Sequence, residues 1–423
     1  MTIDRFLGVF AMTAAGALLS FIAQLFAARW LGSKGYGYFS YVSSIAMTIS
    51  LLAPLGFQAA GLKYLAQYRV QADWELFRSF LNRARKTTGA VSVVAACGLL
   101  AWALSSDLHR ATAGLSFAVL AAVIPLAAHS RLSVSVLRIS GHARSAVGFD
   151  APLREGTIAA MILGAMALQI EASAAAGVVT FAVGFGLSAS LLMNRERRAL
   201  RAFNLPVGAA SAVAVSAEWS RLAVVMLAIT FSQLAMKRLD VLLIGTIAGT
   251  DSVGSYAVAL RFSEALQLPF MAGSVLVTPR IAELSTLRDT AGLQRLLTTG
   301  VRTMLALTLA GALPLLVAPQ LFLGLFGKEF ADADTMLRLL VIGQLANAAT
   351  GYASALLTMS GHERIALATL GVIGAANLVG NAVLITLLGP VGAALGSSTA
   401  MIVANVALWL LAWRYTSVNS AIR

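Results

Sequence analysis

Charged residues are scarce in this chain of 423 residues. Only 12% are Asp, Glu, Lys or Arg, whereas 59% are hydrophobic, and the mean hydropathy is +0.82. A soluble domain carries roughly 25% charged residues, so there are too few charges here to cover a water-facing surface. The shortage argues against a soluble enzyme, a nucleic-acid-binding protein and a disordered chain, and it predicts a polytopic membrane protein.

Cysteine and the motifs of soluble catalysis are nearly absent as well. The single cysteine, Cys97, has no partner for an internal disulfide, and no Cys/His spacing indicates a metal, so we expect neither a metal nor a cofactor. The chain has no G-x-x-x-x-G-K-S/T loop for hydrolysing ATP. No loop carries the paired acids that glycosyl hydrolysis needs. The sequence therefore predicts that the protein is not an enzyme.

Long apolar runs are abundant. A helix needs about 20 mostly apolar residues to cross a bilayer core, and each half of the chain offers six such runs. In the first half they are residues 6–28, 38–61, 87–104, 113–137, 146–168 and 174–193, and in the second half 222–245, 253–278, 301–323, 335–359, 366–388 and 391–413. We therefore expect an all-α protein with twelve transmembrane helices.

The 31 basic residues are distributed unevenly around these spans. Twenty-one lie at or near the amino terminus, the carboxyl tail and the loops that follow even-numbered spans, and four lie in the other loops. Because basic residues collect in cytoplasmic loops, this bias predicts that both termini are cytoplasmic.

The two halves of the sequence resemble each other. The segment Ile-Ser-Gly-His-Ala-Arg at 139–144 recurs as Met-Ser-Gly-His-Glu-Arg at 359–364, after the fourth span of each half. The glycines of the first loop, Gly32 and Gly37, correspond to Gly249 and Gly254. These matches indicate an internal duplication.

An even number of spans in each half makes the two halves parallel repeats, related by an axis along the membrane normal. We predict two six-helix lobes, residues 1–205 and 206–423, with a basic lobe linker that begins near residue 194. Substrate sites of such proteins usually lie between the lobes, near mid-membrane.

A charged side chain at mid-span costs about 2.5–3.5 kcal/mol, so few persist without a reason. The charged residues inside the spans are therefore the candidate functional residues. Span seven carries Lys237, Arg238 and Asp240, and span eight carries Arg261 and Glu264. One interpretation is a cationic cavity between the lobes that binds an anionic substrate. The other is local pairing of Lys237 with Asp240 and of Arg261 with Glu264, each three residues apart. Arg238 has no partner at that spacing within its span and is the stronger ligand candidate.

Other polar residues admit similar alternatives. Arg29, at the outer end of span one, is a further candidate for substrate binding. Asp150 and Arg154 begin span five, and their four-residue spacing favours an ion pair over a ligand or ion-coupling role. Asn377 and Asn381 of span eleven either join helices by hydrogen bonds or line the cavity.

Several short segments, in order along nearly the whole chain, resemble those of bacterial polysaccharide and O-antigen flippases. They are Arg-Trp-Leu-Gly-Ser-Lys-Gly-Tyr-Gly at 29–37, Leu-Asp-Val-Leu-Leu-Ile-Gly at 239–245, Val-Gly-Ser-Tyr at 253–256, Leu-Phe-Gly-Lys-Glu-Phe at 325–330 and Val-Gly-Ala-Ala-Leu-Gly at 391–396. Together they are similar to the multidrug/oligosaccharidyl-lipid/polysaccharide (MOP) exporter superfamily.

This resemblance implies a flippase in the bacterial cytoplasmic membrane. It would move an undecaprenyl-pyrophosphate-linked oligosaccharide from the inner to the outer leaflet by alternating access, for O-antigen, capsule or exopolysaccharide assembly. The implied partners are that substrate, membrane lipids, a polysaccharide polymerase and glycosyltransferases, with no nucleic acid. We expect a monomer.

Two rival functions remain. A cation-coupled multidrug exporter of the same superfamily would place acidic residues in its cavity, whereas the in-span charges here lean towards basic. A membrane scaffold for polysaccharide enzymes, which transports nothing, would not need an in-span cation such as Arg238. Lipid II flippases of the superfamily usually have two more spans, which disfavours a role in peptidoglycan synthesis.

Overall fold

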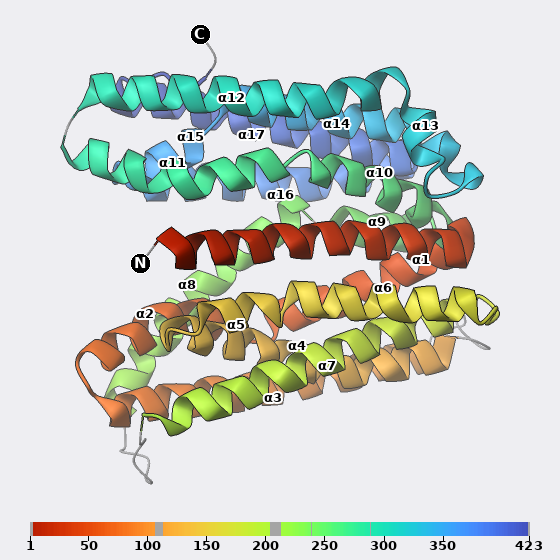
Figure 1. Ribbon diagram of the computed structural model, residues 1–423, viewed down its shortest axis with the longest axis horizontal. Helices are drawn as coiled ribbons and strands as arrows, with labels where there is room; N and C mark the ends of the chain where they lie inside the picture. Colours follow the sequence, from red (N-terminus) through yellow and green to blue (C-terminus); the bar gives the residue numbers. More distant parts are fainter. Residues whose placement is uncertain (1–2, 106–112, 204–212, 238, 288, 422–423) are drawn as a thin grey trace. The chain divides into compact units, whose positions relative to one another are not determined.

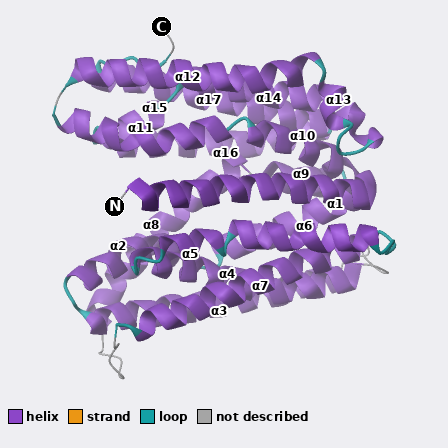
Figure 2. Ribbon diagram, in the orientation of Figure 1, coloured by secondary structure: helices purple, strands orange, loops and turns teal. Residues whose placement is uncertain are grey.

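The computed structural model describes residues 3–105, 113–203, 213–237, 239–287 and 289–421. Within these ranges the regular structure is helical and contains no strand (Figures 1 and 2). The chain divides into two compact units. Unit 1 comprises Met1–Leu31 and Tyr38–Phe231, and unit 2 comprises Gly32–Gly37 and Ser232–Arg423. The lobe boundary expected near residue 205 stays a prediction.

Unit 1 begins with α1 (Ile3–Leu52), whose helical path is interrupted at Gly32, where φ is 67° and ψ is 175°. Its other helices are α2 (Phe57–Val70), α3 (Trp74–Ser105), α4 (Ala113–Ile139), α5 (Ala143–Gly148), α6 (Ala151–Ala167), α7 (Ala174–Arg201) and the first part of α8 (Val213–Lys237). The boundary between the two units falls inside α8, where Phe231 belongs to unit 1 and Ser232 to unit 2.

Unit 2 continues from the end of α8. Its elements are α9 (Leu239–Ile247), the short 3-10 helix η2 (Thr250–Ser252), α10 (Val253–Ala265), α11 (Leu268–Thr286), α12 (Thr290–Val317), α13 (Pro319–Leu323), η3 (Lys328–Ala333), α14 (Asp334–Thr350), α15 (Ala353–Met359), α16 (Glu363–Leu388) and α17 (Pro390–Thr416).

The helices coincide with the twelve predicted spans, which confirms the expected all-α membrane fold. Each apolar run lies within one helix or within two consecutive helices. In the described residues, seven helices are long and apolar enough to cross a membrane by themselves, and α14 with α15, bent by 43°, would make an eighth. Several other runs are split into shorter helices. Proline occupies the first turn of α6, α11, α13 and α17, where its missing N–H costs no helical hydrogen bond.

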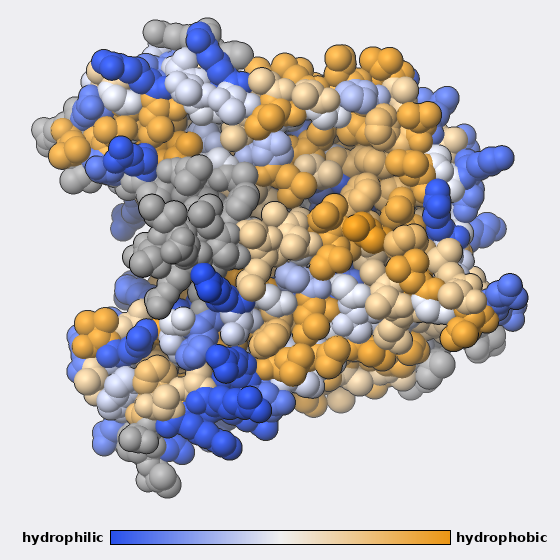
Figure 3. All heavy atoms as spheres, in the orientation of Figure 1, coloured by the Kyte–Doolittle hydropathy of each residue, from blue (hydrophilic) through white to orange (hydrophobic). Residues whose placement is uncertain are grey.

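Large apolar side chains are exposed along the outer helix faces. In unit 1, Val94 is 71% exposed and Leu163 44%, and in unit 2, Val372 is 71% exposed and Leu387 72%. Figure 3 shows apolar residues over much of the helix surface and hydrophilic residues near the helix ends. Such faces are suited to lipid tails, so the chain is a multi-pass membrane protein.

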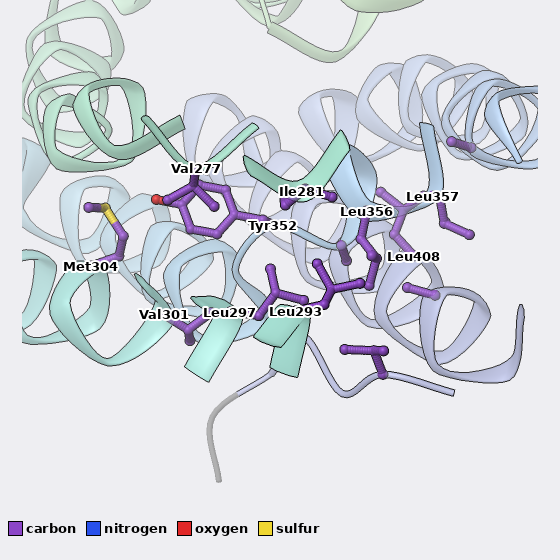
Figure 4. Packing of buried hydrophobic residues seen from close by; sticks show 14 residues of the cluster. Val277, Ile281, Leu293, Leu297, Val301, Met304, Tyr352, Leu356, Leu357 and Leu408 are labelled. Carbon is purple, nitrogen blue, oxygen red and sulfur yellow. The ribbon is translucent and has the colours of Figure 1, made fainter. Parts of the chain in front are cut away.

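Each unit has its own core. In unit 2, Tyr352 packs with Val277, Val301 and Met304 inside one cluster of buried side chains (Figure 4). In unit 1, the Trp219 ring of α8 meets Phe80 edge-on at 5.3 Å, and its indole N–H donates a 2.8 Å hydrogen bond to the hydroxyl of Tyr68 on α2. Trp219 thereby anchors the start of α8 in unit 1.

Backbone conformation supports the internal duplication. The matched glycines share a positive φ, which is 67° at Gly32 and 87° at Gly249, and 82° at Gly141 and 84° at Gly361. Glycine adopts such values readily because it has no Cβ. The same turns therefore occur at equivalent places in the two halves.

Two matched glycines also meet each other within unit 2. A methyl group on Gly37 would lie 2.3 Å from the carbonyl oxygen of Thr250, and one on Gly254 would lie 2.4 Å from the carbonyl oxygen of Ser33. Ser33 and Gly37 occupy the places in the first half that Thr250 and Gly254 occupy in the second. The contact is thus reciprocal, and it leaves no room for a side chain at either glycine.

Candidate functional site

A buried polar cluster joins four helices of unit 2. It consists of Asp240 on α9, Tyr256 on α10, Asn381 on α16 and Ser397 on α17, which are 3%, 0%, 1% and 9% exposed. Asp240 lies in the first turn of α9, where the helix dipole favours a negative charge. Gly396 permits the close approach of α16, because a Cβ there would lie 2.0 Å from Asn381 Oδ1.

Neutral donors surround the Asp240 carboxylate. Its Oδ2 accepts hydrogen bonds from the Tyr256 hydroxyl at 2.6 Å and the Ser397 hydroxyl at 2.7 Å. Its Oδ1 accepts from Asn381 Nδ2 at 3.1 Å, and the same amide also donates to Ser397 Oγ at 3.0 Å. None of the salt bridges found among the described side chains includes Asp240. Its carboxylate is therefore held by dipoles from three other helices.

Two buried amide oxygens of α16, one of them on the Asn381 side chain that contacts this carboxylate, have no hydrogen-bond donor among the described atoms. They are Asn381 Oδ1 and Asn377 Oδ1, which lie one turn apart on the same face of α16 and are both buried. A buried acceptor without a partner costs about 1–3 kcal/mol. Carboxylate, amide and hydroxyl oxygens are the ligands of hard cations. The cluster thus has the chemistry to bind a proton or a small hard cation.

The predicted partner of Asp240 on its own span and the neighbouring ligand candidate lie outside the described residues. This holds for the side chain of Lys237 and for the whole of Arg238. The Lys237–Asp240 pair and the ligand roles of Lys237 and Arg238 therefore stay predictions.

Arg261 and Arg29, the other two residues predicted to bind substrate, belong to different units. Arg261 of unit 2 is 2.8 Å from Glu264 through its Nη1, and the two side chains are 24% and 34% exposed. Arg29 of unit 1 is exposed on α1, three residues before the break at Gly32. Arg261 thus forms an ion pair with Glu264. The roles of Arg261 and Arg29 in binding substrate stay predictions.

In unit 1, three charged side chains lie together at the junction of α5 and α6. The guanidinium of Arg154 lies 3.0 Å from Asp150 and 3.0 Å from Glu155, and it stacks over the ring of Phe185 at 4.6 Å. One oxygen of the buried Glu155, Oε2, has no hydrogen-bond donor in the described structure. Asp150 and Arg154 thus come together with a second carboxylate that sequence spacing did not single out.

Sequence reasoning missed Tyr256 and Ser397 as partners of Asp240. Each lies in a mostly apolar span beside other hydroxyl residues, and no fixed spacing connects residues of α9, α10 and α17. The sequence offered one signal for a polar cluster, the two asparagines of span eleven. They are four residues apart, which places them on one face of the helix.

Comparison with known proteins agrees with this architecture. The MatE family model matches residues 222–383, which include Asp240, Tyr256 and Asn381 and make up less than half of the chain. No curated protein matches the chain.

Solved structures show the fold. The chain is similar to a multidrug resistance MATE family transporter of the MOP superfamily in an inward-facing conformation, at 14% identity and a TM-score of 0.68, over 95% of this chain and 94% of that one. It is similar to the lipid II flippase MurJ in an inward closed conformation, at 14% identity and a TM-score of 0.73, over 95% and 87%. A MOP superfamily transporter from Pyrococcus furiosus, with a binding pocket of reversed polarity, matches at 15% identity and a TM-score of 0.66, over 97% and 95%. The chain therefore has the fold of the MOP exporter superfamily.

Proposed function

We propose that this chain is a transporter that flips a lipid-linked oligosaccharide. The substrate is an undecaprenyl-pyrophosphate-linked oligosaccharide, moved from the inner to the outer leaflet of a bacterial cytoplasmic membrane for O-antigen, capsule or exopolysaccharide assembly. The chain is not an enzyme in this proposal. Its partners are the lipid-linked substrate, a polysaccharide polymerase and glycosyltransferases.

The observation that carries a transport role is the buried carboxylate of Asp240. A charged side chain inside a membrane protein is costly, and such residues commonly mark ion pathways. Neutral donors from three helices surround it, and α16 carries two buried amide oxygens without a donor among the described atoms. A proton or cation bound at Asp240 would compete with these donors for the carboxylate oxygens and so change the contacts between the helices. Cation binding is thereby coupled to movement of the helices that carry the cluster.

The basic residues of spans seven and eight support the proposal that the substrate is anionic. A pyrophosphate concentrates negative charge, which Arg binds bidentately and Lys as a point charge. In this proposal Lys237 and Arg238 bind the pyrophosphate, and Arg261 and Arg29 assist. Because Arg261 pairs with Glu264, its positive charge at the site is partly balanced.

The second candidate function is cation-coupled export of drugs. The MatE match over residues 222–383 favours it, as do the solved MATE transporters of the same fold. Its substrates would be organic cations, for which the carboxylates of Asp240 and Glu264 are the attractive charges.

Reconstitution of the purified chain into vesicles separates these candidates. We expect the vesicles to move a labelled undecaprenyl-pyrophosphate oligosaccharide to the leaflet where an added sugar-modifying enzyme reaches it. Arg238→Ala should abolish this movement, Arg238→Lys should restore part of it, and Arg302→Ala, at the edge of a span, should leave it unchanged. Transport of organic cations without movement of the lipid would establish the drug exporter. If the chain moves neither ligand, the result would favour a membrane scaffold for polysaccharide enzymes that transports nothing.

A second experiment tests the role of Asp240. A cation that binds the folded protein stabilises it by about 2.7 kcal/mol at one hundred times its dissociation constant. We expect Na⁺ or lower pH to raise the thermal stability of the protein, and Asp240→Asn to remove this response. Ser263→Ala, which deletes another buried hydroxyl of unit 2, is the matched control and should keep it. An unchanged response in Asp240→Asn would show that the carboxylate does not couple to a cation.

A further inference from the structure

Arginines gather in a cavity of unit 1 that neither the transport proposal nor the comparisons use. The cavity has a volume of about 430 Å³ and lies between the start of α3 and the end of α7. It is lined by Arg78, Asn82 and Arg85 of α3 and by Arg197 and Arg201 of α7, with leucines beside them. Figure 3 shows a hydrophilic patch over these ends of the two helices.

Helical spacing explains why these side chains converge. Arg78, Asn82 and Arg85 recur at intervals of four and three residues, and Arg197 and Arg201 are four apart, so each set lies on one face of its helix. The facing surfaces of α3 and α7 thus both contribute guanidinium groups to a single cavity.

A buried carboxylate holds one of these arginines in place. Glu196 is 4% exposed, and its Oε1 lies 2.7 Å from Arg85 Nη2. Its Oε2 accepts a 2.6 Å hydrogen bond from the Ser133 hydroxyl on α4. An adjoining cavity of about 220 Å³ is lined by Arg85, Glu196, Ser133 and Arg197 together with His129. Both oxygens of Glu196 are satisfied, and its hydrogen bonds fix the guanidinium of Arg85 at the junction of the two cavities.

The cavity carries a net positive charge. Its four arginines contribute four positive charges and Glu196 one negative charge, which leaves an excess of three. Arginine clusters of this kind bind phosphate groups through charge-assisted and bidentate hydrogen bonds. The chemistry therefore indicates a phosphate-bearing ligand.

The surface of α7 indicates that this phosphate belongs to a lipid. One exposed face of the helix runs through Val183, Leu187, Ser190, Asn194, Arg197 and Arg201, at intervals of three and four residues. It changes along its length from apolar to polar to basic. Arg85 precedes the predicted span 87–104 by two residues, and Arg197 follows the predicted span 174–193 by four. The face therefore passes from the level of lipid tails to the level of lipid phosphates.

We propose that this cavity binds the phosphate headgroup of an anionic phospholipid. Arg85, Arg197 and Arg201 hold the phosphate, Arg78 adds to the positive field, and an acyl chain lies along Val183 and Leu187. Basic pockets between membrane helices bind cardiolipin and related headgroups for the same electrostatic reason. The site is independent of the transported substrate.

The test is native mass spectrometry of the delipidated, detergent-solubilised full chain with added cardiolipin, phosphatidylglycerol or phosphatidylcholine. We expect the two anionic lipids to bind and the zwitterionic lipid to bind more weakly. Losing two arginine–phosphate contacts should weaken anionic lipid binding by about tenfold or more, so this is the change expected for Arg197→Ala/Arg201→Ala. The control Arg195→Ala/Arg198→Ala removes the same charge from the same helix, but neither residue lines the cavities.

Equal lipid binding by the two double variants would overturn the proposal, because it would show that only the overall charge matters. Inorganic phosphate provides the second arm. If it displaces cardiolipin at similar concentrations, the cavity is a site for free phosphate and the lipid assignment is wrong. The exposed positions of Arg197 and Arg201 allow the substitutions without loss of the fold, and thermal unfolding of each variant verifies this.

Discussion

Replacing Tyr256 by phenylalanine removes one hydroxyl from the buried cluster and changes little else. That hydroxyl donates a 2.6 Å hydrogen bond to Asp240 Oδ2, and neither side chain is open to solvent. A hydrogen bond to a charged group contributes about 1.5–3 kcal/mol. Oδ2 keeps the Ser397 hydroxyl at 2.7 Å, so it is not left without a donor. We therefore expect Tyr256→Phe to lower the free energy of unfolding by about 1.5 kcal/mol, the lower end of that range.

A double-mutant cycle isolates this contact. Unfolding free energies in mild detergent are measured for the parent, Tyr256→Phe, Asp240→Asn and the double variant. If Tyr256 acts through the carboxylate, its removal should cost much less in the Asp240→Asn background, with an interaction energy of about 0.5–3 kcal/mol. Additive effects of the two substitutions would refute the reasoning, because they would mean that the two side chains do not depend on each other.

Two further predictions concern topology and packing. Reporter fusions after Arg423 and in the loop around Lys328 should report opposite sides of the membrane, with the carboxyl terminus cytoplasmic, and a matching pair of signals would reject twelve spans. Gly37→Ala places a methyl group 2.3 Å from the carbonyl of Thr250 and should destabilise unit 2 by about 1–3 kcal/mol in thermal or denaturant unfolding. Gly371→Ala, in a helix with open space around it, should be neutral or slightly stabilising, and equal losses in both variants would refute the close contact.

The sequence by itself determined the membrane fold. Helices hydrogen-bond their own backbone, and the bilayer requires each span to be apolar for about 20 residues, so local composition is sufficient to locate them. Each of the twelve apolar runs lies in one helix or in two consecutive helices of the described structure. The repeat was also visible, because Gly141 and Gly361 keep both their neighbours in sequence and their positive φ. Spacing alone further brought Arg154 beside Asp150, and Arg261 beside Glu264.

Only the tertiary structure decided which polar residues from different helices meet. Helical periodicity fixes the face on which a residue lies, but the neighbour of that face depends on how helices pack. For Asp240, spacing offered only a partner on its own span, Lys237, and that pair stays a prediction. The partners that the described structure shows come from α10, α16 and α17. The contact of Arg85 with Glu196 likewise joins α3 to α7 across more than one hundred residues of chain. Such contacts satisfy buried charges through space, and no local pattern in the sequence encodes them.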